Sequence, residues 1–286
     1  MDDERPSLTA EGAAVMRALH QAPLHDPKIL NDPISVRLVD PLSDFYKSRV
    51  DLLERLPALT RQRLEATFVM RSRYAEDCLA EAFEKGVHQY VLLGAGLDTF
   101  AYRQPSWANS LRIFEVDHPA TQRWKRRRLA DASVSVPDNV SFVPVDFEKD
   151  SLATALAQAG PDMSATTFFS MLGVSQYLTA VALDETVRVV LSAPAHSEIV
   201  FRFVLPDHAL PPDEANLAAK FTAQFAALGE AWLTRFEASQ LVAKLTAMGF
   251  SEATHLSSTD ANQRYFRERR DGLNAANLEQ MMRAIV

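Results

Sequence analysis

The sequence predicts an α/β protein: a doubly wound, mostly parallel seven-stranded sheet with helices on both faces, an N-terminal helical layer and a helical insertion after the fifth strand. Three observations lead to this prediction. Short apolar runs alternate with helical patterns between residues 88 and 205, which is typical of a parallel sheet. One run, Tyr90–Leu93, breaks into Gly94-Ala95-Gly96, and acidic residues follow the next two runs. Such features indicate a ligand site at the carboxyl ends of the strands.

The composition is that of one ordinary globular domain. The chain has 286 residues, 47% of them hydrophobic and 23% charged, which is enough to bury a large core. No apolar run approaches the roughly 18 residues that a membrane span needs, and the first residues are acidic where an export signal is basic. We therefore expect a cytoplasmic protein without a membrane partner. The single cysteine, Cys78, excludes an internal disulfide and a multi-cysteine metal site, and no metal is expected.

The charge of the chain argues against a nucleic-acid partner. The formal net charge is -7 at pH 7, which repels polyanions. Basic residues crowd into the segment 123–128, but Trp124 and Leu129 give this segment an inward face, so we predict a solvated helix surface. A small-molecule substrate is expected, and the sequence does not indicate an oligomeric state.

The N-terminal residues 1–60 are predicted to form a helical layer or lid on a core domain at 61–286. Its short helical patterns are interrupted by prolines at five positions: Pro23, Pro27, Pro33, Pro41 and Pro57. A long helix then begins the core domain, with an N-cap at Thr60 and a stop at Gly86.

The core domain is predicted as a regular alternation. Strands are expected at 88–93, 111–116, 140–145, 166–171 and 198–205, and helices from about residue 99 and at 119–131, 150–159 and 179–192. Asp150 suits a helix cap and Gly160 a helix end. An insertion at about 206–235 carries a helix at 213–230, and a further helix runs from about 236 to Gly249. Two strands, 250–257 and 262–267, close the sheet.

The glycine turn indicates a cofactor that lies against the main chain, since glycines tolerate unusual backbone angles and have no Cβ. The dinucleotide fingerprint needs a further glycine where this chain has Thr99. Asp98, in the same turn, would repel a diphosphate and suits a positively charged ligand. S-adenosyl-L-methionine has a sulfonium, an ammonium and no phosphate, and it fits these conditions better than a nicotinamide dinucleotide.

Acidic side chains after the second and third strands are candidates to hold a nucleoside. Glu115 and Asp117 lie about 20 residues after the glycines and can accept hydrogen bonds from ribose hydroxyls, although Asp117 could instead cap the following helix. Asp146 could accept from the adenine amino group while Phe147 contacts the base. An ordinary strand-to-helix turn is the alternative for this pair.

Arg71 is a charged residue within the apolar stripe of the long helix. It shares a stripe with Leu64, Phe68, Ala75 and Leu79 at spacings of three and four, and the other members of that stripe are apolar. A buried guanidinium costs several kcal/mol unless an anion meets it. The anion is either a structural Asp or Glu, or the carboxylate of a bound amino-acid ligand.

The acceptor pocket is expected between the N-terminal layer and the insertion. After the fourth strand, Gly173 permits close approach, and Gln176 and Tyr177 are candidates for positioning a substrate. Four phenylalanines either line this pocket or pack the core: Phe201, Phe203, Phe221 and Phe225. An apolar acid or a hydroxylated aromatic is the expected substrate.

Three segments carry a resemblance to a known family: 91–103 with its Leu-Gly-Ala-Gly-Leu-Asp-Thr block, 114–129 with its Glu-Val-Asp-His-Pro block, and 168–178. They resemble the leucine carboxyl methyltransferase family, a branch of the class I S-adenosylmethionine-dependent methyltransferases with a Rossmann-like fold. The resemblance covers roughly residues 12–255. Members of this family methylate carboxyl groups, such as the C-terminal leucine of a phosphatase subunit or the acid of a polyketide, and others are bacterial proteins without an assigned substrate.

The resemblance implies roles for individual residues. Gly94 would contact the cofactor, together with Gly96 in the same turn. Asp117 would hold the ribose, and Asp146 with Phe147 would hold the adenine. Arg71 matches the arginine that pairs with the methionine carboxylate.

Two positions extend this assignment. Arg17 matches a second basic residue in the family's N-terminal segment. Leu172 is a departure, because family members often have a glutamate there, near the methionine amino group. Either a backbone carbonyl or Asp98 makes that contact in this chain, or the chemistry on the substrate side has diverged.

The expected function is S-adenosylmethionine-dependent O-methylation of a carboxylate on a small, largely apolar molecule. Methyl transfer is an in-line displacement that depends on alignment and needs no metal. A carboxylate, with a pKa near 4, needs no general base, whereas a phenol, with a pKa of about 10, would benefit from one. Alternatives are methylation of a phenol or hydroxyl, an NAD-dependent oxidoreductase, and a noncatalytic binding module of the same fold.

Overall fold

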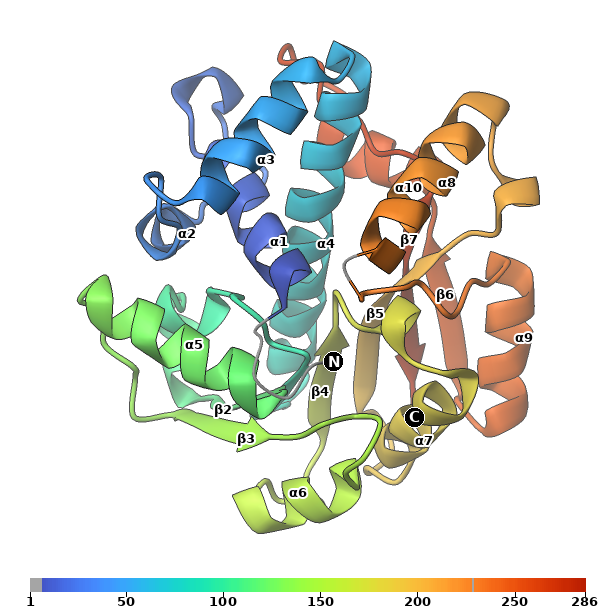
Figure 1. The fold of residues 1–286 in the computed structure, drawn as a ribbon. Coiled ribbons are helices and arrows are strands. Elements are labelled where there is room, and N and C mark those ends of the chain that lie inside the picture. Colours follow the sequence, from blue (N-terminus) through green and yellow to red (C-terminus); the bar gives the residue numbers. More distant parts are fainter. Residues whose placement is uncertain (1–6, 228) are drawn as a thin grey trace.

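The computed structural model describes residues 7–227 and 229–286 and contains a seven-stranded sheet with helices on both faces (Figure 1). Its strands are β1 (Gln89–Leu93), β2 (Arg112–Asp117), β3 (Val140–Pro144), β4 (Thr167–Met171), β5 (Glu198–Val204), β6 (Glu252–Leu256) and β7 (Glu279–Ile285). Their order is β3-β2-β1-β4-β5-β7-β6; β1 to β5 are parallel, and β7 is antiparallel to β5 and β6. The strand order reverses between β1 and β4, where sheets of this kind bind ligands.

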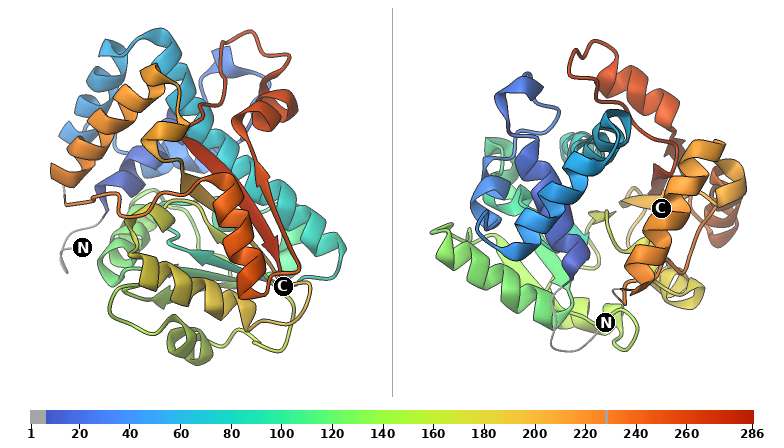
Figure 2. Two further views of the ribbon diagram at one scale, coloured as in Figure 1. Left: turned by 90° about the vertical axis from the view of Figure 1, so that its right-hand side faces the viewer. Right: turned by 45° about the horizontal axis from the view of Figure 1, so that its top comes forward.

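The helices comprise an N-terminal layer, the long helix that follows it, and helices that connect or follow the strands. The N-terminal layer contains α1 (Leu8–Leu19), α2 (Pro33–Leu38) and α3 (Asp44–Arg55), and it is followed by the long helix α4 (Ala58–Glu84). The remaining helices are α5 (Pro119–Asp131), α6 (Leu152–Ala159), α7 (Ala180–Leu191), α8 (Pro212–Ala227), α9 (Ala238–Met248) and α10 (Ser258–Ala261). Figures 1 and 2 show α1 and α3 beside the upper part of α4, with α8 across from them.

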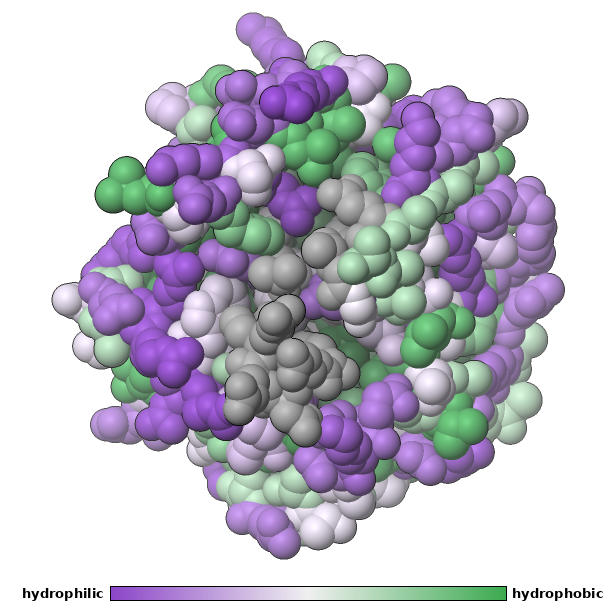
Figure 3. All heavy atoms as spheres, in the orientation of Figure 1, coloured by the Kyte–Doolittle hydropathy of each residue, from purple (hydrophilic) through white to green (hydrophobic). Residues whose placement is uncertain are grey.

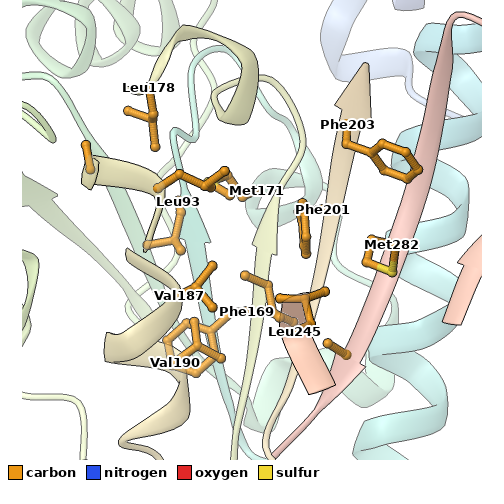
Figure 4. Close-up of a cluster of buried hydrophobic side chains, with 14 of the residues drawn as sticks. Leu93, Phe169, Met171, Leu178, Val187, Val190, Phe201, Phe203, Leu245 and Met282 are labelled. Carbon is orange, nitrogen blue, oxygen red and sulfur yellow. The ribbon is translucent and has the colours of Figure 1, made fainter. Parts of the chain in front are cut away.

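Each face of the sheet has its own apolar core because side chains alternate along a strand. One core joins the sheet to α6, α7 and α9, and Figure 4 shows Phe169, Phe201 and Phe203 within it. The other core joins Phe168 and Val200 to α4. Of the two alternatives for Phe201 and Phe203, core packing is therefore confirmed and the place in an acceptor pocket is not. The side chain of Phe225 lies outside the described residues.

The alternation of strands and helices from β1 to β5 is confirmed, with one exception. The helix expected from about residue 99 is replaced by two short 3-10 turns, Phe100–Tyr102 and Ser106–Ser110. Gln104 precedes Pro105, and a residue before proline is pushed toward extended backbone, so a helix cannot continue through this point.

The last expected strand, 262–267, is wrong. Asn262–Phe266 instead continues α10 as a π-helical turn, and the Asn262 side chain accepts a hydrogen bond from Ala275 N at 2.7 Å. The seventh strand is β7, whose residues Met281, Met282 and Ala284 are fully buried. Both faces of the sheet are covered at β7, so apolar residues lie on either side of it, Met281 in one core and Met282 and Ala284 in the other, and no simple alternation results.

Two predicted caps are also displaced. Helix α4 begins at Ala58 after Pro57, two residues before the expected cap at Thr60. Ser151, and not Asp150, caps α6 by accepting a hydrogen bond from Thr154 N at 3.3 Å. The described ranges contain no helix with both the length and the apolar character to cross a membrane.

Buried polar groups fasten the N-terminal layer to α4 and to the segment after α10. His25 Nε2 lies 3.1 Å from Glu65 Oε1, and His25 Nδ1 lies 2.8 Å from Asp271 Oδ2. Arg269 Nε donates to Asp271 Oδ1 at 3.0 Å. Burial acts to raise the pKa of Asp271, but hydrogen bonds from Arg269 and His25 outweigh it and hold the pKa at about 2.

We expect Asp271→Asn to destabilise the protein by about 1 kcal/mol at neutral pH. The folded-state pKa lies below the unfolded value of about 3.8, so this contribution is fully present above that value and is lost as the pH falls through about 2. Urea unfolding of both proteins at pH 7 and pH 3 measures it. A difference that stays constant between these two pH values would contradict the assignment.

Candidate active site

A cavity of about 550 Å³ lies over the carboxyl ends of β1, β2, β4 and β5, a size typical of small-molecule sites. Its walls come from α1, α3, α4 and the segment 229–233. Figure 3 shows this face hollowed near its centre, with apolar side chains visible between hydrophilic ones. The lining contains every predicted site residue except Glu115: Arg17, Arg71, Gly94, Gly96, Asp98, Asp117, Asp146, Phe147, Leu172, Gln176 and Tyr177.

The glycine turn is held in left-handed backbone conformations, with φ of +73° at Gly94 and +48° at Gly96. A Cβ at Gly94 would lie 1.8 Å from Val174 Cγ2, and one at Gly96 would lie 3.1 Å from Ala10 Cβ. At Gly94 the missing Cβ therefore makes room for the loop after β4, and not directly for a ligand as we expected. Any larger residue there would displace that loop from the cavity wall.

Asp117 turns its carboxylate back onto the glycine turn. Its Oδ2 accepts a hydrogen bond from Gly96 N, and its Oδ1 accepts one from His118 N at 2.6 Å. Helix α5 is capped by His118, so the alternative that Asp117 caps it is wrong. Burial raises the pKa of Asp117, while the two backbone donors act to lower it. Each oxygen keeps a lone pair that can accept from a ribose hydroxyl.

Asp146 and Phe147 form the turn after β3. Asp146 Oδ1 accepts from Glu148 N at 3.1 Å, and Oδ2 lies 3.3 Å from Lys149 Nζ. Phe147 packs against the apolar core and also lines the cavity. The segment is thus an ordinary strand-to-helix turn that also faces the ligand site.

Glu115 does not reach the cavity, contrary to our expectation. Its side chain is 1% exposed and lies 2.7 Å from Lys125 Nζ, and Tyr102 Oη donates to it at 3.0 Å. Burial raises the pKa of Glu115, and Lys125 opposes this shift. Glu115 lies two residues before the strand end, inside the sheet, whereas Asp117 lies at its rim. The predicted solvated helix surface is confirmed at Arg123, Arg126 and Arg127, which are exposed, but not at Lys125, which is as buried as Glu115.

Arg17 joins α1 to the glycine turn. Its Nε donates to Asp32 Oδ2 at 3.0 Å, and its Nη2 donates to Leu97 O at 2.6 Å. Asp32 is fully buried, and its pKa is lowered because Arg17 and Arg103 outweigh the effect of burial. The guanidinium of Arg17 is therefore committed to the protein and positions the turn that carries Asp98.

Arg71 has no ion pair or hydrogen bond with any residue in the described ranges, although it is only 7% exposed. Its guanidinium lies 4.5 Å from the centroid of the Phe68 ring. A Cβ at Gly173 would lie 3.7 Å from Arg71 Nη2, which places this cation at the end of β4. Burial and the nearby Arg202 lower the pKa of Arg71 to about 9. Of the two sequence alternatives, the structural Asp or Glu partner is absent from the described residues.

The remaining predicted residues line the middle of the cavity. Asp98 Oδ1 accepts from Phe100 N at 2.8 Å. Gln176 Nε2 donates to Gly173 O at 3.3 Å, and the buried Gln176 Oε1 has no hydrogen-bond partner in the described part of the chain. Tyr177 and Leu172 contribute further lining. Gln176 therefore offers one buried acceptor to a ligand.

The sequence analysis missed Arg202 and Glu279, which also line the cavity. Arg202 interrupts the apolar β5 run Ile199–Val204, the same signal that singled out Arg71 in α4. Glu279 belongs to β7, which was not predicted. It forms an ion pair with Arg202 Nη1.

One cluster in the described residues has metal-ligand spacing: His20, His25 and Glu65. Ile29 N donates to His20 Nε2 at 3.1 Å, so the ring proton of His20 is on Nδ1, which donates to Glu65 Oε1 at 2.9 Å. A protonated Nδ1 cannot ligate a metal. The cluster fastens the N-terminal layer and lies apart from the cavity.

The fold and the cavity define a class I methyltransferase architecture, and sequence comparisons identify the family. A model of the leucine carboxyl methyltransferase family matches residues 10–191. YktD of Bacillus subtilis, named as a candidate S-adenosyl-L-methionine-dependent methyltransferase, is 33% identical over 96% of both chains. A Mycobacterium tuberculosis protein with the same description is 33% identical over 72% of this chain and 70% of its own length. The chain belongs to the leucine carboxyl methyltransferase family and is an S-adenosylmethionine-dependent methyltransferase.

Solved structures agree on the fold. A DUF574 family protein from Streptomyces avermitilis has a TM-score of 0.61 at 14% identity and covers 98% of this chain and 99% of its own. A candidate methyltransferase from Thermobifida fusca has a TM-score of 0.60 at 17% identity, over 99% of this chain and 96% of its own.

The residues of the cavity fit S-adenosylmethionine. Arg71 is a buried cation without an anion, which suits a methionine carboxylate. At the other end, Asp117 and Asp146 offer carboxylate acceptors where β2 and β3 end, which suits ribose and adenine donors. The cofactor supplies an electrophilic methyl group on a sulfonium. The nicotinamide alternative is set aside by the family assignment.

Proposed function

We propose that this protein transfers the methyl group of S-adenosylmethionine to a carboxylate of a small, largely apolar acid and so forms a methyl ester. The observation that carries the proposal is the apolar part of the cavity lining, which comes from α3, α4, α8 and the residue before β7: Leu53, Leu64, Phe68, Phe221 and Leu278. Such a wall favours an apolar body over a sugar or a nucleotide. The reaction would take place in the cytoplasm, on a free small molecule and not on nucleic acid or a membrane.

For this reaction the protein has to align the acceptor oxygen, the methyl carbon and the sulfur, and little else is required. A carboxylate oxygen attacks the methyl carbon, the carbon–sulfur bond breaks with its electron pair going to sulfur, and a neutral ester and S-adenosylhomocysteine result. No proton moves, so no general base is needed. His118 is the one imidazole in the described lining, and its Nδ1 already accepts from Ala120 N at 3.3 Å. Tyr177 and Gln176 are the positioning candidates for the acceptor.

The proposal predicts an alkali-labile product. Purified protein is incubated with methyl-labelled S-adenosylmethionine and a panel of apolar acids (phenylacetate, indole-3-acetate, octanoate) and phenols. We expect labelled esters that release methanol in alkali, because esters hydrolyse there and aryl ethers do not. A label that resists alkali would favour the phenol alternative. Tight binding of S-adenosylhomocysteine without transfer to any acid or phenol would favour the noncatalytic module.

A further inference from the structure

Arg202 lies in the middle of a buried strand and faces the cavity. It is 3% exposed and lies on the sheet face toward α4, since its neighbours Phe201 and Phe203 belong to the opposite core. A guanidinium in this position is costly unless its donors are satisfied.

The hydrogen-bonding of Arg202 is only partly satisfied. Nη1 forms the ion pair with Glu279, but Nε and Nη2 are buried and have no partner among the residues that the structure describes. These two nitrogens form one edge of the planar guanidinium, the edge that binds a carboxylate through two parallel hydrogen bonds. An unsatisfied buried donor pair of this shape is complementary to one carboxylate.

Arg71, Arg202 and Glu279 lie near one another and carry a net charge of +1, which balances one anion, while Nε and Nη2 of Arg202 are donors for a second. Arg202 lies close enough to Arg71 to disfavour the charge of Arg71, and Glu279 lies near both arginines. Arg17 is already neutralised by Asp32. The other acids of the lining lie at or after the ends of β1 to β3, except Glu230 in the segment 229–233, which interacts with Arg49 of α3. A methionine carboxylate on Arg71 would compensate one cation and would leave the free edge of Arg202 unpaired.

The surroundings of Arg202 suit an acid with an apolar body. The lining adjacent to it in the fold comes from α4 and from the residue before Glu279, namely Leu64, Phe68 and Leu278. Phe221 of α8 also lines the cavity. A ligand whose carboxylate met Arg202 would therefore bury its hydrocarbon part against these side chains.

We propose that the Nε and Nη2 edge of Arg202 binds the carboxylate of the methyl acceptor and selects apolar monocarboxylic acids. This inference rests on the proposed carboxyl methylation. Arg202 holds and orients the acceptor, and one carboxylate oxygen uses a remaining lone pair for attack. Esterification removes the negative charge, so the product loses its charge-assisted hydrogen bonds to Arg202 and dissociates more readily than the substrate.

Binding of acids and their amides tests the inference without relying on turnover. Protein saturated with S-adenosylhomocysteine is titrated by calorimetry with phenylacetate, indole-3-acetate and octanoate, and with the neutral amide of each. We expect at least one acid to bind tenfold or more tightly than its amide. In Arg202→Gln the affinity for that acid should fall at least tenfold, while the amide is unaffected.

Two further variants keep the test independent of folding defects. The double variant Arg202→Gln/Glu279→Gln removes the cation and its buried partner together, so that no isolated carboxylate is left, and should show the same loss of acid preference. Arg188→Gln removes an exposed arginine of α7 and should preserve it. Wild-type protein that prefers no acid, or an Arg202→Gln protein with unchanged acid affinity, would overturn the inference.

The cofactor is the second possible occupant of this edge. If Arg202→Gln weakened S-adenosylhomocysteine binding tenfold or more, Arg202 would serve the cofactor and the inference would be wrong. The labelled-methyl assay separates the two proposals. Ester formation at equal KM in wild type and Arg202→Gln would leave the function standing and overturn the role of Arg202. Arg202-dependent binding of an acid that is never methylated would overturn the proposed function, and would leave Arg202 as an acid-binding residue but not as the residue that binds a methyl acceptor.

Discussion

Arg71→Met is expected to stabilise the cofactor-free protein by about 1–4 kcal/mol while weakening S-adenosylhomocysteine binding by about 2–5 kcal/mol. The gain in stability arises because a buried guanidinium with no anion among the described residues is replaced by an apolar side chain of similar length. The loss of affinity arises because the ligand carboxylate then enters the cavity without a counter-ion. Denaturant unfolding without ligand and calorimetry with S-adenosylhomocysteine measure the two effects.

Arg73→Met is the matched control. Arg73 lies two residues along the same helix, is exposed, and pairs with Asp77 at 2.7 Å outside the cavity. Its replacement should leave the cofactor affinity unchanged and the stability within about 0.5 kcal/mol. The assignment of Arg71 fails if Arg71→Met destabilises the ligand-free protein and binds S-adenosylhomocysteine as tightly as the wild type.

Lys125→Met is expected to cost about 3–5 kcal/mol of stability, because it leaves Glu115 ionised, 1% exposed and without its cation. Tyr102 still donates one hydrogen bond to Glu115, but a neutral donor does not balance a buried charge. The double variant Glu115→Gln/Lys125→Met should recover most of the loss. Urea unfolding of both variants at pH 7 measures these differences.

Cofactor binding by variants of Glu115 and Asp117 shows whether Glu115 is structural or holds the ribose. Glu115→Gln should keep the wild-type affinity for S-adenosylhomocysteine, since this residue does not line the cavity. By contrast, Asp117→Asn should weaken that affinity. A tenfold or larger loss in Glu115→Gln protein that remains folded would return Glu115 to the site.

The sequence was most informative where a residue departs from its local pattern. The glycines that follow β1 and the arginine within the apolar stripe of α4 both depart from the local pattern, and both line the cavity. Arg202 is likewise a charged residue within an apolar run, in β5, and the sequence analysis did not identify it. Glu115 and Asp117 show the limit of such patterns: both lie on one side of β2, and only the distance of each from the strand end decides which of them reaches the cavity.

Elements that depend on distant partners were the least predictable. The segment 262–267 has strand-like residues, yet it is helical because Ser257 caps α10 and Asn262 bonds to Ala275. β7 lacks the alternation of a surface strand because apolar cores cover both of its faces. The partner of Arg202 was missed for the same reason, since Glu279 opens that strand.

The placement of β7 between β5 and β6 has a consequence for biosynthesis. During translation, β5 and β6 leave the ribosome before residues 279–285, and each exposes a row of unsatisfied backbone groups until β7 arrives. We therefore expect the nascent chain to be prone to self-association in that interval. Methyl-transfer competence should also appear late, because Glu279, the counter-ion of Arg202, is delivered by the same strand.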